Sequence, residues 1–254
     1  MLADLDGEAA ERAARELTAT GPGQAVAAQL DVADRAAVLA LVEQLASERG
    51  RLEMMVNNAG VLFAGPFEET TERHWAKAID VHLRGVIHGA HAAYGVMLRQ
   101  RVGKASAGVI LNTGSLAGLI PAPTMTPYAT TTWAVVGFSQ ALHAQARRHG
   151  IQGNIVCPAY VDTKLIDEPF EPSRSYAVGS FRRNTRLYQP RLTTPARVAE
   201  VALRSVEDNR PVITVGGFAA LSWRTQRFAP AVMRTSTRLQ AAREARQGRT
   251  VSGT

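Results

Sequence analysis

The chain has 254 residues, of which 46% are hydrophobic and 20% are charged, and it carries a net charge of +7 at pH 7. It is long enough to build one full-sized hydrophobic core. It holds no run of about 18 apolar residues and starts without the basic and apolar segments of a secretory signal, so neither a membrane-spanning helix nor secretion is expected. Its single cysteine, Cys157, excludes an internal disulfide and fits a reducing cytoplasm.

The positive charge is concentrated at the C-terminus. From Phe218 onward the sequence has seven arginines and one acid, Glu244, so this tail carries about +6 of the +7. The distribution favours a globular enzyme at 1–217 with a basic tail at 218–254, and zinc-ligand spacings and nucleic-acid-binding motifs are lacking. We therefore expect neither a metal nor a nucleic acid as a partner. The tail is expected to be a solvated basic helix with some packing, with contact to an anionic membrane surface or a partner subunit as the alternative.

Short apolar runs alternate with helical patterns along the first 217 residues. The predicted strands are 25–30, 52–56, 109–112, 154–157 and 211–215. The predicted helices are 34–49, 72–100, 128–149 and 195–207. This alternation implies a parallel sheet covered on both faces, a doubly wound, Rossmann-like α/β fold. Segment 164–192 has weak periodicity and is expected to be a long excursion, which in such folds is usually either a functional lid or disordered.

Recognisable motifs follow the predicted strands. Residues 2–6 read Leu-Ala-Asp-Leu-Asp, 29–32 read Gln-Leu-Asp-Val, and 57–60 read Asn-Asn-Ala-Gly. Residues 112–118 read Asn-Thr-Gly-Ser-Leu-Ala-Gly, and 157–163 read Cys-Pro-Ala-Tyr-Val-Asp-Thr. In this order and spacing, they resemble the motifs of the short-chain dehydrogenase/reductase family over roughly residues 1–217.

The resemblance implies a catalytic serine at Ser115 and a catalytic tyrosine at Tyr128, which lie at the family's spacing. In that family the tyrosine exchanges a proton with the substrate oxygen, the serine holds that oxygen, and a lysine lowers the tyrosine pKa. Thr132 stands at the lysine position. A free tyrosine titrates near ~10, so losing an adjacent cation could cost about ten- to a thousandfold in available phenolate.

A second departure lies at His82, where the family usually has an asparagine whose backbone helps to hold a water on the proton relay. One hypothesis is that His82 partly replaces the missing cation. The favoured alternative is a histidine packed in its helix.

The resemblance also implies contacts to a nicotinamide dinucleotide from the following residues: Asp4, Asp31, Val32, Asn58, Ala59, Gly60, Val161 and Thr163. The Asp4 carboxylate would repel a 2′-phosphate, which favours NAD over NADP. Asp4 lies at the start of the chain, whereas a glycine-rich phosphate turn normally comes about 20 residues before this acid. We therefore expect the first strand, the glycine-rich loop and the first helix to be missing, and NAD binding to be weak.

Two functions remain open. The first is hydride transfer between an alcohol and a ketone, impaired in this chain, with a small-molecule substrate. The second is a non-catalytic relative that acts as a subunit partner or scaffold. The family assembles through the helices that correspond to 72–100 and 128–149, so a homo-oligomer is expected. The aromatic and arginine residues of 164–192 suggest an apolar substrate with an anionic group, although ordinary solvated arginines are the favoured interpretation.

Overall fold

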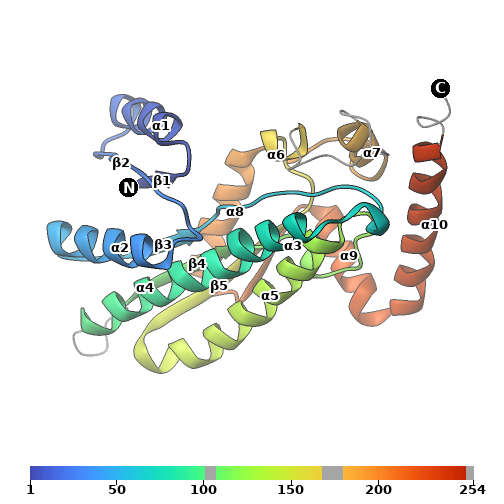
Figure 1. Ribbon diagram of the computed structural model, residues 1–254. Helices are drawn as coiled ribbons and strands as arrows, with labels where there is room; N and C mark the ends of the chain where they lie inside the picture. The colour runs from blue at the N-terminus through green and yellow to red at the C-terminus, as the bar shows by residue number, and fades with distance from the viewer. Residues whose placement is uncertain (101–106, 168–179, 250–254) are drawn as a thin grey trace.

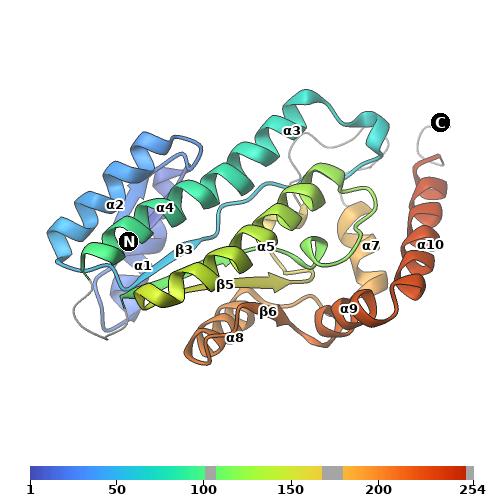
Figure 2. The same cartoon turned by 90° about the horizontal axis from the view of Figure 1, so that it is seen from below.

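The computed structural model describes residues 1–100, 107–167 and 180–249, with side chains as far as Glu244. Its centre is a four-stranded parallel sheet in the order β3-β4-β5-β6, and a separate two-stranded parallel sheet pairs β1 with β2. Helices α2, α4 and α5 lie on one side of the larger sheet and α8 on the other (Figures 1 and 2). The strands are β1 Leu2–Asp4, β2 Ala27–Gln29, β3 Met54–Asn57, β4 Gly108–Thr113, β5 Ile151–Pro158 and β6 Val212–Val215. The predicted parallel α/β class is confirmed.

The first five α-helices are α1 Gly7–Thr20, α2 Arg35–Arg49, α3 Glu72–Ala78, α4 Gly85–Arg99 and α5 Thr126–Ala146. The remaining five are α6 Lys164–Asp167, α7 Ser180–Tyr188, α8 Pro195–Glu207, α9 Gly217–Phe228 and α10 Pro230–Arg249. The predicted excursion at 164–192 thus contains α6 and α7, while 168–179 lie outside the described residues.

Local chemistry explains several helix ends. The Asp34 carboxylate accepts hydrogen bonds from the backbone N–H groups of Ala36 and Ala37, which would otherwise lack helical partners at the start of α2. Gly50, with φ 76°, ends the same helix in the left-handed region that glycine enters without steric cost. Thr194 caps α8 with Pro195 in its first turn. These boundaries were predicted from the sequence.

The predicted helical segment at 72–100 is confirmed, but it holds one feature that was not predicted. A π-helical segment, Ile79–Arg84, separates α3 from α4 and contains His82. A π turn inserts backbone without breaking the hydrophobic stripe, so the apolar spacing that indicates a helix does not reveal it. Such segments are frequent at functional sites.

The two sheets do not join in the described residues. Leu2–Asp4 pair with Ala27–Gln29, whereas the first strand of the larger sheet, β3, pairs only with β4. Val56, within β3, is 48% exposed. This division does not by itself show that a strand is missing, because a strand does lie at Leu2–Asp4; that part of the sequence analysis stays a prediction.

The basic tail forms two helices, α9 and α10, at the opposite end of the molecule from α1 (Figure 1). Met233, Thr237 and Glu244 of α10 are buried, so one face of this helix packs against the rest of the chain. The division of the chain at residue 217 stays a prediction.

Candidate active site

The carboxyl ends of β3 to β6 lie at one edge of the larger sheet, because all four strands are parallel. Two consecutive buried hydrogen bonds, made by side-chain amides, hold this edge together. Asn57 Nδ2 donates to Asn112 Oδ1 at 2.8 Å, and Asn112 Nδ2 donates to Ser139 Oγ at 2.9 Å. These two hydrogen bonds join the last residue of β3 to β4 and to α5. They therefore fix the two strand ends relative to the helix that begins beside Tyr128.

Ser115 and Tyr128 are brought together at this edge. Ser115 follows β4 and its Oγ accepts a hydrogen bond from the N–H of Ala117 at 3.1 Å. The Ser115 side chain acts on the hydroxyl of Tyr128, which lies in the first turn of α5. Burial raises the pKa of Tyr128, although the Ser115 side chain lowers it in part. The phenol therefore stays protonated at neutral pH.

Tyr128 packs against an apolar wall drawn from several segments. Its partners include Leu62, Met125 and Ile166, together with Phe181 of α7. This wall explains the loss of solvent around the phenol, and hence the raised pKa. It also provides an apolar surface beside the Tyr128 hydroxyl, the group on which substrate chemistry would depend.

Thr132 lies one turn after Tyr128 in α5 and is buried. Its hydroxyl donates to the backbone carbonyl of Tyr128 at 2.9 Å, so it is satisfied within the helix. Among the described residues, the side chains that act on the Tyr128 pKa are Ser115 and Cys157, neither of which is a cation. The substitution at the lysine position is thus not compensated electrostatically by the part of the chain that the structure describes.

His82 is locked by two hydrogen bonds. Its Nε2 accepts from the N–H of Val61 at 2.8 Å, so the proton of the neutral ring lies on Nδ1, which donates to Thr131 Oγ1 at 3.0 Å. The Thr131 hydroxyl is within 3.0 Å of the Pro127 and Tyr128 carbonyls. The imidazole ring also packs edge-on against the Tyr128 ring, with 5.1 Å between the ring centroids.

Burial is the main cause that lowers the pKa of His82 to about 4. His82 is therefore neutral at pH 7. A neutral imidazole supplies no positive charge to Tyr128, which goes against the hypothesis that His82 replaces the cation. Its two hydrogen bonds instead tie the loop after β3 to α5.

This geometry predicts a pH-dependent stability. Below pH 6.5 the unfolded chain protonates His82 while the folded chain does not until about pH 4, so the free energy of unfolding falls with falling pH. The loss should be about 2 kcal/mol between pH 6.5 and about pH 5. His82→Asn should remove this part of the slope in urea unfolding, whereas His91→Asn, at an exposed position of α4, should keep it. Equal slopes in the two variants would contradict the assignment.

The residues expected to bind a dinucleotide fall into two groups. Asn58, Ala59 and Gly60 follow β3, and Val161 and Thr163 follow β5, at the same sheet edge as Ser115. Asn58 Oδ1 accepts a hydrogen bond from Thr113 Oγ1 at 3.0 Å. A Cβ at Gly60 would come within 3.1 Å of His82 Nε2, so any larger residue there would have to displace the ring by a few tenths of an ångström.

The second group belongs to the smaller sheet. Asp4 ends β1, and Asp31 and Val32 follow β2. The carbonyl of Val32 lies 3.0 Å from His88 Nδ1 of α4, which connects this loop to the helices of the larger sheet. The two groups of predicted contacts thus lie on separate sheets joined by such loop contacts.

A hollow of about 580 Å³ lies at the carboxyl ends of β1 and β2 and was not predicted from the sequence. It is lined by Leu5, Asp6, Gly7, Glu8, Glu11, Ala27, Ala28 and Gln29. Three of these are acids, and Asp6 already accepts the Ala9 N–H at the start of α1. An acidic, capped helix start disfavours a phosphate group.

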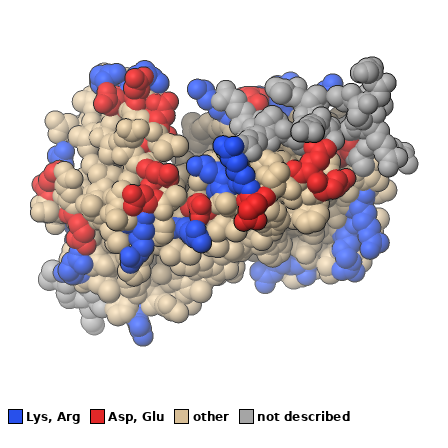
Figure 3. Space-filling view, in the orientation of Figure 1, with Lys and Arg blue, Asp and Glu red and all other residues tan. Residues whose placement is uncertain are grey.

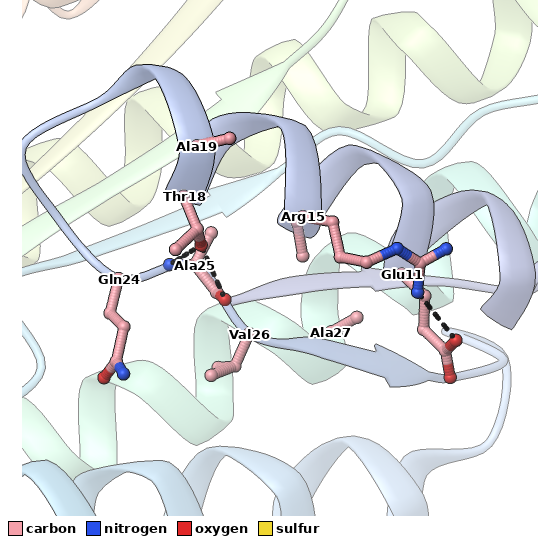
Figure 4. Close-up of a pocket in the computed structure, with 9 residues that line it drawn as sticks. Glu11, Arg15, Thr18, Ala19, Gln24, Ala25, Val26 and Ala27 are labelled. Atoms are coloured by element: carbon pink, nitrogen blue, oxygen red, sulfur yellow. Dashed lines mark hydrogen bonds and ion pairs between the residues drawn. The ribbon is translucent and has the colours of Figure 1, made fainter.

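A second hollow, of about 540 Å³, lies between α1 and β2 (Figure 4). Its lining is closed by an ion pair between Arg15 and Glu11 and by the hydrogen bond from the Ala25 N–H to Thr18 Oγ1. None of the residues expected to take part in chemistry lines it. It is a surface depression rather than part of the candidate active site.

The arginines of the 164–192 excursion are only partly described. Arg182 of α7 forms ion pairs with Asp162 at 2.7 Å and Asp167 at 2.5 Å, so its charge is already balanced. This removes Arg182 as a candidate for binding an anionic substrate. Phe170, Arg174 and Tyr176 lie outside the described residues. Within those residues, no cluster of three histidine, cysteine or acidic side chains could hold a metal ion, and no helix is long and apolar enough to cross a bilayer.

Comparison with known families gives one match to the sequence model for short chain dehydrogenases, over residues 1–173. The match begins at the first residue and does not itself show a truncation. Among curated proteins, the chain is 29% identical over 94% of its length to "Probable oxidoreductase EphD" of Mycobacterium tuberculosis. It spans only 40% of that relative's length, so the relative is a much longer protein.

A second relative is of matching size. The "Inactive 2-(S)-hydroxypropyl-CoM dehydrogenase 2" of Xanthobacter autotrophicus is 31% identical, and the alignment covers 86% of this chain and 91% of the relative. Among solved structures, a short chain dehydrogenase/reductase of Burkholderia phymatum in complex with NAD has a TM-score of 0.79 at 27% identity, covering 91% and 84% of the two chains. A gluconate 5-dehydrogenase of Burkholderia cenocepacia in complex with NADP and tartrate has a TM-score of 0.72 at 26% identity, covering 86% and 84%.

Proposed function

Because the chain belongs to the short-chain dehydrogenase family, we propose that it is a nicotinamide-dependent oxidoreductase acting on an alcohol and ketone pair, with impaired catalysis. The observation that carries the proposal is the proximity of Ser115 and Tyr128 at the carboxyl edge of the sheet, without a described cation that acts on the phenol. The bound cofactor would supply or accept the hydride. This chain's own residues would handle the proton and the substrate oxygen.

The Ser115 hydroxyl would hold the substrate oxygen and Tyr128 would exchange a proton with it. Reduction of a ketone requires Tyr128 as a phenol, the form that its raised pKa favours. Oxidation of an alcohol requires the phenolate, which burial without a cation makes scarce. We therefore expect alcohol oxidation to be the more strongly impaired direction.

The residues present fit a dinucleotide in part. Asp4 and the acidic hollow beyond it suit a ribose diol and repel a 2′-phosphate, which favours NAD over NADP. The first turn of α1, which carries Asp6 and Glu8, does not suit a pyrophosphate. For this reason we expect cofactor binding to be weak.

A titration with NAD and with NADP tests this proposal. We expect weak binding of NAD and about tenfold weaker binding of NADP, measured by calorimetry. Asp4→Ala should abolish this preference, because a hydrogen bond to a charged group contributes roughly 1.5–3 kcal/mol. Glu16→Gln, a change at an exposed position of α1, should keep it. A preference for NADP in the parent chain would overturn the assignment of Asp4.

The alternative is a non-catalytic subunit partner. Two observations favour it: Thr132 at the lysine position, and the relative whose name calls it inactive. In either case, we propose that copies pair through α4 and α5, which expose Ile87, Leu98 and Trp133. Sensitive turnover assays with NAD and a panel of secondary alcohols separate the two functions, since a partner protein shows no turnover above that of a Tyr128→Phe variant.

A further inference from the structure

The two C-terminal helices expose several large apolar side chains. We define the C-terminal surface by four side chains, Leu221 and Phe228 of α9 and Val232 and Leu239 of α10. They are 66%, 82%, 61% and 68% exposed, respectively. The two residues on each helix are seven positions apart, which is about two helical turns. They therefore lie on one side of their helix. Large apolar side chains gathered in this way mark a binding surface.

The charges around this surface have one sign. Arg224, Arg227, Arg234 and Arg238 are exposed on the same two helices. The sequence has no acid from Gly217 to Arg243, and the next residue, Glu244, is buried. Figure 3 shows the basic side chains grouped over the C-terminal end of the molecule, at the lower right. The surface therefore combines apolar residues with positive charge, and no acid of residues 217–243 balances that charge.

Packing on the opposite side fixes which face of α10 points outward. Met233 and Thr237 are buried, and Thr124 Oγ1, in the loop before α5, donates to Glu244 Oε2 at 2.8 Å. Thr124 has φ 60°, and its carbonyl accepts the Gly65 N–H at 2.8 Å. These contacts anchor α10 to the loops around Tyr128. Val232 and Leu239 are consequently held outward.

We propose that the C-terminal surface binds a bilayer that contains anionic lipids. Phe228, Leu221, Val232 and Leu239 would enter the boundary of the acyl chains, and the flanking arginines would lie at the level of the headgroups. A nucleic acid would match the arginines but would leave three aliphatic side chains in water. An apolar partner protein would not require five arginines without a single intervening acid.

The test is co-sedimentation of the whole chain with vesicles of phosphatidylcholine alone or of phosphatidylcholine with phosphatidylserine. We expect binding to the second kind, weakened as salt rises. Phe228→Ser should weaken vesicle binding about tenfold or more, because it removes a large apolar side chain that would be buried in the bilayer. Phe67→Ser, at a residue of similar exposure (63%) outside this surface, should leave it unchanged. Arg234→Gln with Arg238→Gln should weaken binding further and reduce its salt dependence.

Three results would overturn the proposal. The chain does not sediment with the phosphatidylserine vesicles, Phe228→Ser and Phe67→Ser lose equal amounts of vesicle binding, or the chain binds duplex DNA but not vesicles. Self-association that Phe228→Ser abolishes, without vesicle binding, would assign the surface to a second copy. Circular dichroism of each variant distinguishes lost binding from lost folding. The assay needs no cofactor or turnover, so it stands apart from the oxidoreductase proposal.

Discussion

Thr132→Lys should lower the pKa of Tyr128 and raise the rate of alcohol oxidation. Thr132 lies one helical turn from Tyr128, and no described cation acts on that phenol. A positive charge nearby typically lowers such a pKa by about 1–3 units, which corresponds to about ten- to a thousandfold more phenolate at neutral pH. The pKa is measured by ultraviolet titration of the tyrosines, with Tyr128→Phe to identify the signal. The rate is measured from NADH formation at saturating alcohol.

The matched control for this variant is Thr132→Met, which supplies a similar stem without the ammonium group. Both variants put a long side chain at a buried position, so both should lose stability by similar amounts. Only the lysine should move the Tyr128 titration. A lowered pKa with no gain in turnover would favour the partner-subunit function, because the proton chemistry would then be repaired without restoring catalysis. An unmoved pKa would show that the Thr132 substitution does not control Tyr128.

The proximity of Ser115 and Tyr128 could be predicted only from the resemblance to the family's motifs, in which a serine and a tyrosine stand at this spacing. The helix caps at Asp34 and Thr194 could also be predicted, since a cap depends on neighbours a few residues away. The neutral state of His82 could not. It depends on Val61 and Thr131, which reach the ring from two distant segments, and on burial that only the fold creates.

The same reasoning applies to the C-terminal tail. Its charge is visible in the sequence, but the anchoring of Glu244 on Thr124 spans 120 residues and carries no local signal. Without that contact, the tail reads as a solvated helix; with it, α10 has a defined inner and outer face. The acidic hollow at α1 likewise requires β1 and β2 to pair before Asp6 and Gln29 line the same space.

Asn112→Ala should destabilise the chain by about 4 kcal/mol. Asn112 is fully buried, and its side chain both accepts from Asn57 and donates to Ser139. Removing it leaves the Asn57 amide without this acceptor, takes a donor from Ser139 and opens a cavity between β4 and α5. Each unsatisfied buried group costs about 1–3 kcal/mol, and the cavity adds to that loss.

Urea unfolding measures this loss as a lower midpoint at an unchanged slope. Ser139→Ala is the control: it leaves one buried donor, Asn112 Nδ2, without its acceptor and opens almost no cavity, so it should cost about 2 kcal/mol. Because both residues share a hydrogen bond, the double variant should lose less than the sum of the single losses. Two results would show that these hydrogen bonds do not hold the sheet edge together. One is that the losses in the free energy of unfolding are strictly additive in the double variant; the other is that Asn112→Ala loses no more than Ser139→Ala. The loss of these hydrogen bonds should also weaken the Ser115–Tyr128 contact, since Asn112 lies on the strand that positions Ser115 and Ser139 lies on the helix that positions Tyr128.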